Sequence, residues 1–236
     1  MSNAPLYLTR RYVFQNTHCP VKYNPPMDKR RYVQRRRAES AQQTRERVLE
    51  AARSSLRSGP LGAVKVDDIA REAGVARSTL YVLFGSRPGL LEAVADDLLE
   101  HAGFDRLVKA FRLPDARMAL LESLRAGTEA YATDADLARS LLTLAATDPD
   151  AAGAVRRFER GRWPGMRNLA GRLEAQGYLR DDVSRQEAAQ ILWVLTSFPT
   201  FDQLFRERAL SSAAVADRLR AMAGRTLLRA ASPDAP

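Results

Sequence analysis

Residues 64–84 hold the side chains best suited to chemistry with a partner, and they read VKVDDIAREAGVARSTLYVLF. Two short helices are expected on either side of a turn at Gly74, with an apolar set between them formed by Ile69, Ala70, Val75, Leu80 and Phe84. This is a helix-turn-helix pattern, in which the second helix protrudes and fits the major groove of DNA. Its outward side chains suit base edges, phosphates and thymine methyl groups, and they belong to Arg77, Ser78, Thr79, Tyr81 and Val82.

Positive charge is concentrated in the same part of the chain. The 236 residues carry a net charge of +9, but residues 1–89 contain 17 Lys and Arg against 7 Asp and Glu. The remaining residues carry a net charge of −1. A concentrated basic segment attracts phosphate polyanions or anionic membrane surfaces. The alternative is a solvated basic tail that has no partner.

Composition excludes several other classes of protein. No stretch approaches the roughly 20 apolar residues of a membrane helix, and the amino terminus has no secretory signal. Cys19 is the single cysteine, so we expect a reducing, cytoplasmic setting. The pair His18 and Cys19 supplies too few ligands for a metal site. We find no catalytic arrangement of side chains and no cofactor-binding loop, and therefore expect no enzyme, metal or cofactor.

The pattern along the chain predicts an all-α fold. Residues 1–39 are expected to be a disordered basic arm, and Ser40 with Gln43 to form a capping box that starts the first helix. Ser86 is expected to cap the fourth helix. A three-helix unit would span 40–88, with the helix-turn-helix motif at about 65–84, and a larger helical unit would span 89–231 before a tail at 232–236. Further helices are predicted at 88–111, 115–132, 135–146, 150–176, 185–209 and 212–230.

Residues from about 40 to 95 resemble the amino-terminal domain of TetR-family transcriptional regulators. The resemblance is carried by RERVLEAA, VDDIAREAGV, STLYVLF and SRPGLLEAV, which occur in the family's order and spacing. It implies an all-α homodimer with two DNA-binding heads and a carboxy-terminal domain that dimerises and binds an effector. Such proteins usually repress transcription and release DNA when a small molecule binds.

The resemblance also implies roles for single residues. Arg77 would read guanine, Ser78 and Val82 would face base edges or thymine methyls, and Thr79 and Tyr81 would touch phosphates or bases. Phosphate contacts are implied for Arg87 at the start of the fourth helix, for Lys65, and for Thr44 and Arg45 near the start of the first helix.

The chain departs from the family pattern at Lys65, Ala76, Leu83 and Gly89, where capping or phosphate-binding side chains are common. These departures put phosphate affinity in doubt. We hypothesise that the arginine-rich arm compensates for them by entering a minor groove.

Aromatic residues in the larger unit allow two interpretations. Trp163 and Pro164 interrupt a helical run, where proline should kink or split the helix. With Tyr131 and Phe158, Trp163 would line an effector pocket, or all three would be ordinary core. A stripe of Val194, Phe198, Phe201 and Phe205, with Leu219 and Met222, would form the dimer seam or internal core, and TSFPTFDQLF is similar to the end of a dimer-forming helix in the family. His101 would be a sensor of pH or effector, or a plain surface histidine.

These observations predict a cytoplasmic, homodimeric regulator that binds a palindromic double-stranded DNA operator and responds to an unknown small molecule. A non-specific or architectural DNA-binding protein without an effector is the first alternative. A helical enzyme with a basic targeting arm is the second, although residues 90–236 offer no catalytic arrangement.

Overall fold

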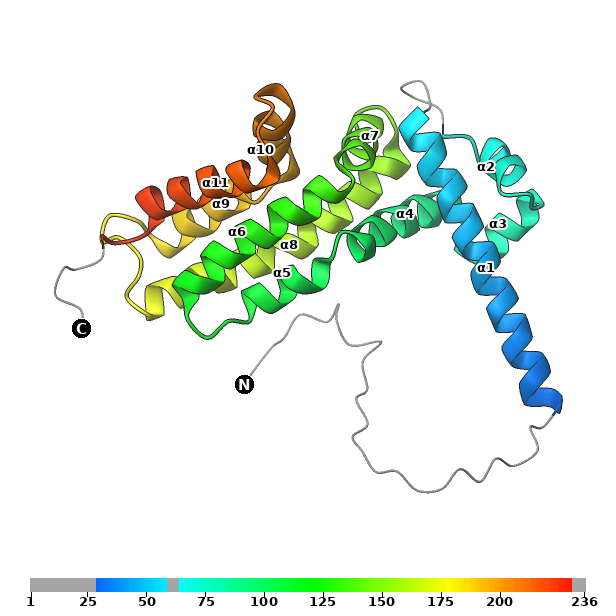
Figure 1. The fold of residues 1–236 in the computed structure, drawn as a ribbon, viewed down its shortest axis with the longest axis horizontal. Coiled ribbons are helices and arrows are strands. Elements are labelled where there is room, and N and C mark those ends of the chain that lie inside the picture. Colours follow the sequence, from blue (N-terminus) through cyan, green and yellow to red (C-terminus); the bar gives the residue numbers. More distant parts are fainter. Residues whose placement is uncertain (1–28, 59–63, 231–236) are drawn as a thin grey trace. The chain divides into compact units, whose positions relative to one another are not determined.

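The computed structural model describes residues 29–58 and 64–230, and Figure 1 traces their helices in chain order. The predictions for residues 1–28, for the His18–Cys19 pair and for the tail at 232–236 lie outside these residues. Every named element in the described part is helical, and its one β-bridge joins Leu179 to Leu228. The predicted all-α fold is therefore confirmed. None of these helices is both long and apolar enough to cross a bilayer.

Eleven α-helices and a π-helical turn follow one another along the described residues. They are α1 (Lys29–Ser58), α2 (Val66–Glu72), α3 (Arg77–Phe84), α4 (Arg87–His101), α5 (Phe104–Phe111), α6 (Ala116–Thr133), α7 (Ala135–Ala145), α8 (Pro149–Ala175), α9 (Arg185–Leu195), α10 (Phe198–Asp202), η1 (Gln203–Glu207) and α11 (Ser212–Leu227). The chain divides into two compact units, Met1–Glu46 and Arg47–Pro236, and α1 contains the division.

The first unit corrects two predictions about the start of α1. The helix begins at Lys29 instead of Ser40, so the last part of the predicted disordered arm is helical. Ser40 lies inside the helix and does not cap it; its carbonyl oxygen accepts a 2.8 Å hydrogen bond from the hydroxyl of Thr44. One local pair lies in the added stretch, where Arg35 Nε is 3.3 Å from a carboxylate oxygen of Glu39, four residues later. Such pairs stabilise a helix of strong helix formers.

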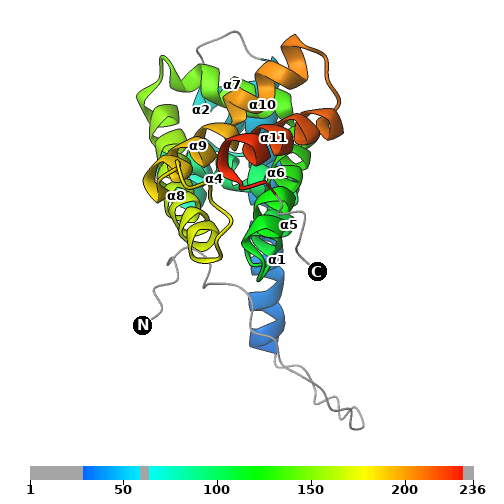
Figure 2. The same cartoon turned by 90° about the vertical axis from the view of Figure 1, so that its left-hand side faces the viewer.

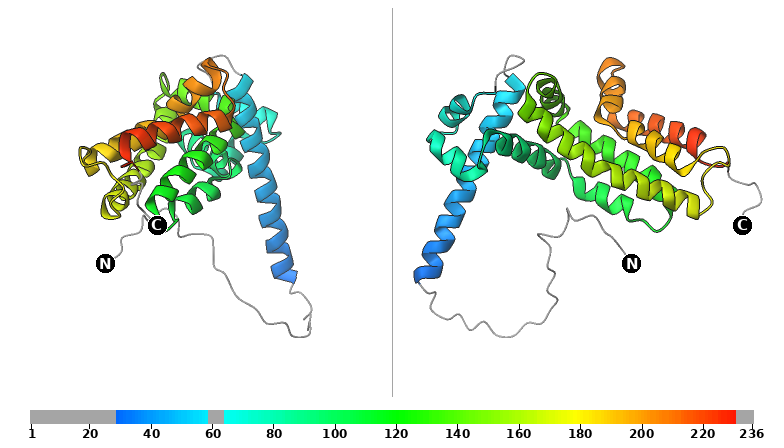
Figure 3. Two further views of the ribbon diagram at one scale, coloured as in Figure 1. Left: turned by 60° about the vertical axis from the view of Figure 1, so that its left-hand side comes forward. Right: turned by 180° about the vertical axis from the view of Figure 1, so that it is seen from behind.

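Within the second unit, the helix-turn-helix elements share a buried core with the helices that follow them. The core contains Val48, Leu49, Ala52 and Leu56 of α1, Ile69 and Ala70 of α2, Leu80 of α3, and Leu90, Leu91 and Val94 of α4. It continues into Leu137, Leu141 and Leu144 of α7 and into Ala151 and Ala154 of α8. Figure 3 shows α4 leading from α3 toward α7 and α8. The core therefore crosses the domain boundary predicted between residues 88 and 89.

A second buried cluster fills the space among α6, α8, α9, α10 and α11. The helix α6 packs against α8 and α11, and α9 packs against α8 and α11 (Figure 2). Pro164 lies inside α8, which is not split there. The buried side chains of Met166 and Leu169 in the same helix hold this segment against the cluster, so packing compensates for the hydrogen bond that proline removes.

Two predicted helices are broken. The predicted helix 88–111 is two helices, α4 and α5, because Gly103 has a φ of +71° and starts α5 anew. Glycine adopts this left-handed conformation at little cost. The predicted helix 185–209 is α9, α10 and η1. The hydroxyl of Ser197 caps α10, and Pro199 lies in its first turn, where a missing N–H costs little.

The start of α4 leaves no room for a side chain at Gly89. A Cβ there would lie 2.1 Å from the carbonyl oxygen of Phe84. We expect Gly89→Ala to lower the free energy of unfolding by about 1–3 kcal/mol because of this overlap. The control Gly153→Ala lies in α8, where an added Cβ meets nothing within 4 Å, and it should be neutral or stabilise by up to about 1 kcal/mol. Urea unfolding followed by circular dichroism at one protein concentration measures both. Equal stability of Gly89→Ala and wild type would contradict this packing.

Candidate nucleic-acid interface

The α2–turn–α3 segment buries one face and exposes the other. Ile69, Ala70 and Leu80 are buried, and Gly74 in the turn has a φ of +65°. On α3, the exposed residues include Arg77, Ser78, Tyr81 and Val82. Val82 is 84% exposed, so its apolar side chain projects from the outward face of α3. The outward face predicted from the sequence is present, with Thr79 half-buried at its edge.

Arg77 makes contacts with side chains of both α2 and α3. Its Nη1 lies 3.2 Å from both carboxylate oxygens of Asp67 in α2. Its Nη2 donates a 3.1 Å hydrogen bond to the hydroxyl of Tyr81, and its Cζ lies 5.6 Å from the centre of the Tyr81 ring. The hydrogen bond to Tyr81 and the negative charge of Asp67 raise the pKa of Arg77 above its ordinary value. The guanidinium is thus held at the surface by groups from two helices.

The other predicted DNA contacts have varied surroundings. Lys65 is exposed just before α2, and neither Lys65 nor Ala76 gives its helix a side-chain cap, as predicted from their types. Thr44 and Arg45 belong to the first unit, and both are half-buried. Their contact with a DNA backbone stays a prediction.

Arg87 does not match its predicted role as a free phosphate ligand. Its guanidinium lies 2.6 Å from one oxygen of Asp148 and 2.7 Å from Asp150, and its Nε donates to the carbonyl oxygen of Val64 at 3.3 Å. Both Arg87 and Asp148 are mostly buried, at 25% and 17% exposure of their side chains. Asp148 also accepts hydrogen bonds from Asp150 N and Ala151 N, which cap α8. Arg87 therefore joins the start of α4 to the start of α8.

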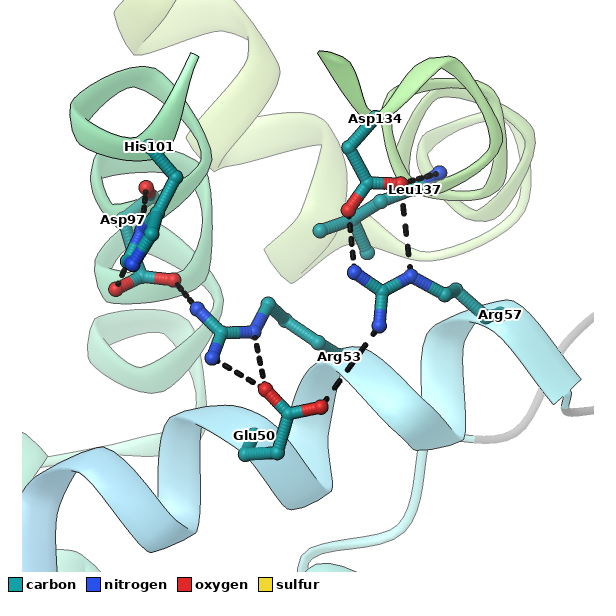
Figure 4. A network of polar contacts seen from close by, with 7 residues as sticks. All are labelled: Glu50, Arg53, Arg57, Asp97, His101, Asp134 and Leu137. Carbon is teal, nitrogen blue, oxygen red and sulfur yellow. Dashed lines mark hydrogen bonds and ion pairs between the residues drawn. The ribbon is translucent and has the colours of Figure 1, made fainter. Parts of the chain in front are cut away.

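A second arginine network joins α1 to later helices, and the sequence pattern did not reveal it (Figure 4). Arg53 pairs with Glu50 and with the mostly buried Asp97 of α4. Arg57 pairs with Asp134, whose side chain also caps α7 through the N–H of Leu137. A signal for these contacts was available at the breaks before α7 and α8, because aspartate is a common helix cap there, but the arginine partners lie far away in the sequence.

The residues predicted to line an effector pocket pack on or beside the second buried cluster, and no described pocket is lined by them. Tyr131 donates a 3.1 Å hydrogen bond to the carbonyl oxygen of Thr196, and its ring meets that of Phe198 edge to face at 5.3 Å. Burial raises the pKa of Tyr131. Trp163 packs against the second buried cluster, and Phe158 lies 5.9 Å from the guanidinium carbon of Arg162. Their role in effector binding stays a prediction.

A cavity of about 150 Å³ lies at the bend between α4 and α5, against α6. Its lining includes His101, Gly103, Arg106, Glu129 and Thr133. His101 is 65% exposed, and its Nδ1 lies 2.9 Å from the carbonyl oxygen of Asp97. The cavity is smaller than the pockets of several hundred Å³ that hold drug-sized ligands.

Burial divides the residues predicted for the dimer seam. Phe198, Phe201 and Leu219 are buried within one chain, at 6%, 1% and 2% exposure, so their prediction as seam residues is wrong. They pack in the second cluster, where Phe205 stacks on Phe201 at 4.9 Å. Val194 and Met222 remain exposed, at 53% and 42%, and so does Trp193 beside Val194. A helical spacing of apolar residues predicts that one face of the helix is buried. It does not tell whether that face packs inside the same chain or against a second copy.

Residues 48–94 match the family model of bacterial regulatory proteins of the tetR family. The HTH-type transcriptional regulator AlkX of Mycobacterium tuberculosis is 40% identical over 73 residues, which are 28% of this chain and 35% of that protein. This chain thus matches about a third of the length of that relative.

The likeness to solved structures extends further along the chain. NalD, the secondary repressor of the MexAB-OprM multidrug efflux pump in Pseudomonas aeruginosa, has a TM-score of 0.64 at 21% identity over 82% of this chain and all of that one. A regulator from Saccharomonospora viridis in complex with choline has a TM-score of 0.58 at 19% identity over 79% and 98%. At these identities the likeness shows a shared fold.

The contacts of Arg87 predict how its removal acts on stability and on pH dependence. We expect Arg87→Ala to lower the free energy of unfolding by about 1–3 kcal/mol at pH 7, because it leaves a mostly buried carboxylate without its partner. The hydrogen bond from Arg87 holds the pKa of Asp148 below its ordinary value. This stabilisation is present above the unfolded pKa of about 3.9 and is lost as the pH falls through the lower folded value. The variant should therefore lose less stability than wild type below about pH 4.

The control is Arg71→Ala, because Arg71 is 78% exposed and pairs with Asp68 at the surface. It should change stability by less than about 0.5 kcal/mol. Urea unfolding between pH 7 and pH 2.5 measures both variants. If Arg87→Ala left stability unchanged but lowered the salt dependence of DNA binding, Arg87 would be a phosphate ligand after all.

Proposed function

We propose that this chain, whose residues 48–94 match the family model of bacterial regulatory proteins of the tetR family, is a cytoplasmic, homodimeric repressor that binds a palindromic operator and responds to a small molecule. The face of α3 carries this proposal. Arg77, Tyr81 and Val82 stand exposed on a helix whose opposite side is fixed by Leu80 against the core. Side chains on such a helix can reach base edges in the major groove.

The chemistry of this face fits sequence reading. A guanidinium can make two hydrogen bonds to guanine, and an apolar tip such as that of Val82 can pack on a thymine methyl group. The hydroxyls of Ser78 and Thr79 suit bases or phosphates. Lys65 and the basic residues of α1 add charge that attracts the DNA backbone, so binding should weaken strongly as salt rises.

A second copy of the chain would complete the binding unit, because a palindromic operator presents two equivalent half-sites. The exposed apolar side chains of Trp193, Val194 and Met222 lie on α9 and α11 and support a dimer surface there. A two-fold interface buries the same patch on both copies. The internal aromatic cluster of Phe198 and Phe201 would support this surface from beneath.

Control by a small molecule requires that a change in the larger helical part alter the DNA-binding helices. Arg87 and Arg57 offer a route, because each holds the aspartate that caps the start of α8 or α7. A ligand that favours one placement of these helices would shift DNA affinity only by its difference in affinity for the two states. The regulator from Saccharomonospora viridis in complex with choline and the repressor NalD share this fold and support the proposal by analogy.

Non-specific or architectural DNA binding is the second candidate function. The observation in its favour is the excess of basic residues in residues 1–89, which would bind any duplex through its phosphates. Non-specific binding does not account for the contacts that Arg77 makes with Asp67 and Tyr81 on one face.

Selection from a pool of random-sequence duplexes with the full chain tests the function. We expect a short palindrome to be enriched, and Arg77→Ala with Tyr81→Ala to weaken binding to it by about 10- to 100-fold, the worth of a good base contact. Fluorescence anisotropy with the selected duplex and with a scrambled duplex measures the loss. Arg71→Ala is the control, since Arg71 is an exposed arginine on α2. Enrichment of no sequence would support the architectural alternative.

The proposed dimer surface is tested by a charge in its centre. We expect Val194→Glu with Met222→Glu to convert a dimer into a monomer, because two carboxylates would have to be buried without partners. Met118→Glu is the matched control, because Met118 is 50% exposed on α6. Sedimentation velocity at micromolar concentration gives the masses. A dimer that survives the double substitution would place the interface elsewhere.

A further inference from the structure

The contact between Asp67 and Arg77 links α2 to the outward face of α3. Arg77 Nη1 lies 3.2 Å from each oxygen of Asp67, and Nη2 donates to the hydroxyl of Tyr81 at 3.1 Å. The Tyr81 ring lies 5.6 Å from the guanidinium carbon. Groups on two helices therefore fix the plane of one guanidinium.

The contact between Arg77 and Asp67 contributes little to the free energy of folding. The side chains of Arg77 and Asp67 are 58% and 61% exposed, and ion pairs between exposed side chains contribute little. Arginine side chains are flexible, so a free Arg77 would sample many orientations. The effect of Asp67 is to select one of them at the surface proposed to read DNA.

The geometry leaves the donors needed for a base. A guanidinium has five N–H donors in a rigid fork, and the bonds to Asp67 and Tyr81 use at most three of them. The carboxylate of Asp67 accepts hydrogen bonds from Nη1. Nη2 has two hydrogens, and the hydroxyl of Tyr81 accepts one of them. When that is the hydrogen facing Nη1, the opposite edge, formed by Nε and Nη2, presents two parallel donors, which is the pattern that guanine O6 and N7 accept.

We infer that Asp67 is a positioning residue that sets the orientation of the Arg77 guanidinium and thereby the preference for guanine at one base pair of each half-site. The inference rests on the proposed function. Asp67 touches no base; it acts through Arg77. Its carboxylate also repels phosphates, so the positioning effect has to be separated from a plain effect of charge.

Asp68 provides the matched control, because it is the next residue of α2 and pairs with Arg71 through a single 3.0 Å contact. The variants Asp67→Asn and Asp68→Asn remove the same charge from the same turn. The probe is a fluorescein-labelled duplex selected from the random pool with the full chain. Its four versions differ at the one position whose preference is lost in Arg77→Ala, and a scrambled duplex reports affinity without sequence.

We expect both asparagine variants to bind the scrambled duplex more tightly, by a similar factor. Asp68→Asn should keep the ratio of affinities between guanine and the other bases at the tested position. Asp67→Asn should lower that ratio at least fivefold there and leave it unchanged at other positions. Asp67→Glu should retain part of the ratio, because a carboxylate remains within reach of Nη1.

Three results would overturn the inference. An unchanged ratio in Asp67→Asn would reduce Asp67 to a surface charge, and a raised ratio would mean that Asp67 withholds Arg77 from the base. In either case a selected motif still stands, so the proposed function survives. A selection that enriches no sequence with wild type would remove the proposed function, and the inference with it. Circular dichroism melting of all variants checks that the exposed substitutions leave the fold intact.

Discussion

The packing of α4 is the constraint on which the rest of the second unit depends. Leu90, Leu91 and Val94 lie in one buried cluster with residues of α1, α2 and α3 on one side and of α7 and α8 on the other. Close-packed protein interiors transmit displacements because few voids can absorb them. The helix that presents Arg77 and the helices of the larger part are therefore parts of one packed body, even though their sequences suggest two separate units.

Arginine–aspartate pairs constrain the angles between the packed helices. Arg57 and Arg87 each reach an aspartate that also caps a helix, Asp134 for α7 and Asp148 for α8. Apolar packing alone tolerates small rotations, whereas a two-pronged contact between guanidinium and carboxylate fixes angles as well as distance. An arginine–aspartate pair also lies at the surface between Arg77 and Asp67, where a single nitrogen, Nη1, contacts both carboxylate oxygens. In all three cases, the aspartate lies at a helix start, where the helix dipole favours negative charge.

Local signals allowed much of the fold to be predicted, and long-range contacts account for most of the errors. The turn at Gly74 and the cap at Ser86 depend on neighbouring residues, and the structure confirms both. The partner of Arg87 lies 61 residues away at Asp148, so the sequence did not indicate the pair, and the family resemblance implied a phosphate contact instead. The exposed face of α3 was predictable because its spacing is helical, but the bond from Arg77 to Asp67 required the angle between two helices. The same holds for Phe198 and Phe201. Their spacing predicts an apolar face, but it does not tell which residues pack against that face.

Asp134 and Asp148 each cap a helix and also pair with an arginine. These two roles together limit how the length of α7 can vary. One residue added between the two aspartates would turn everything that follows by about 100° and advance it by about 1.5 Å. The carboxylate of Asp148 would then point away from Arg87 while still able to start its own helix. We therefore expect an insertion or deletion in this stretch to leave helix formation intact but to break the contact between Arg87 and Asp148. In this respect α7 acts as a spacer of fixed length between the two aspartates.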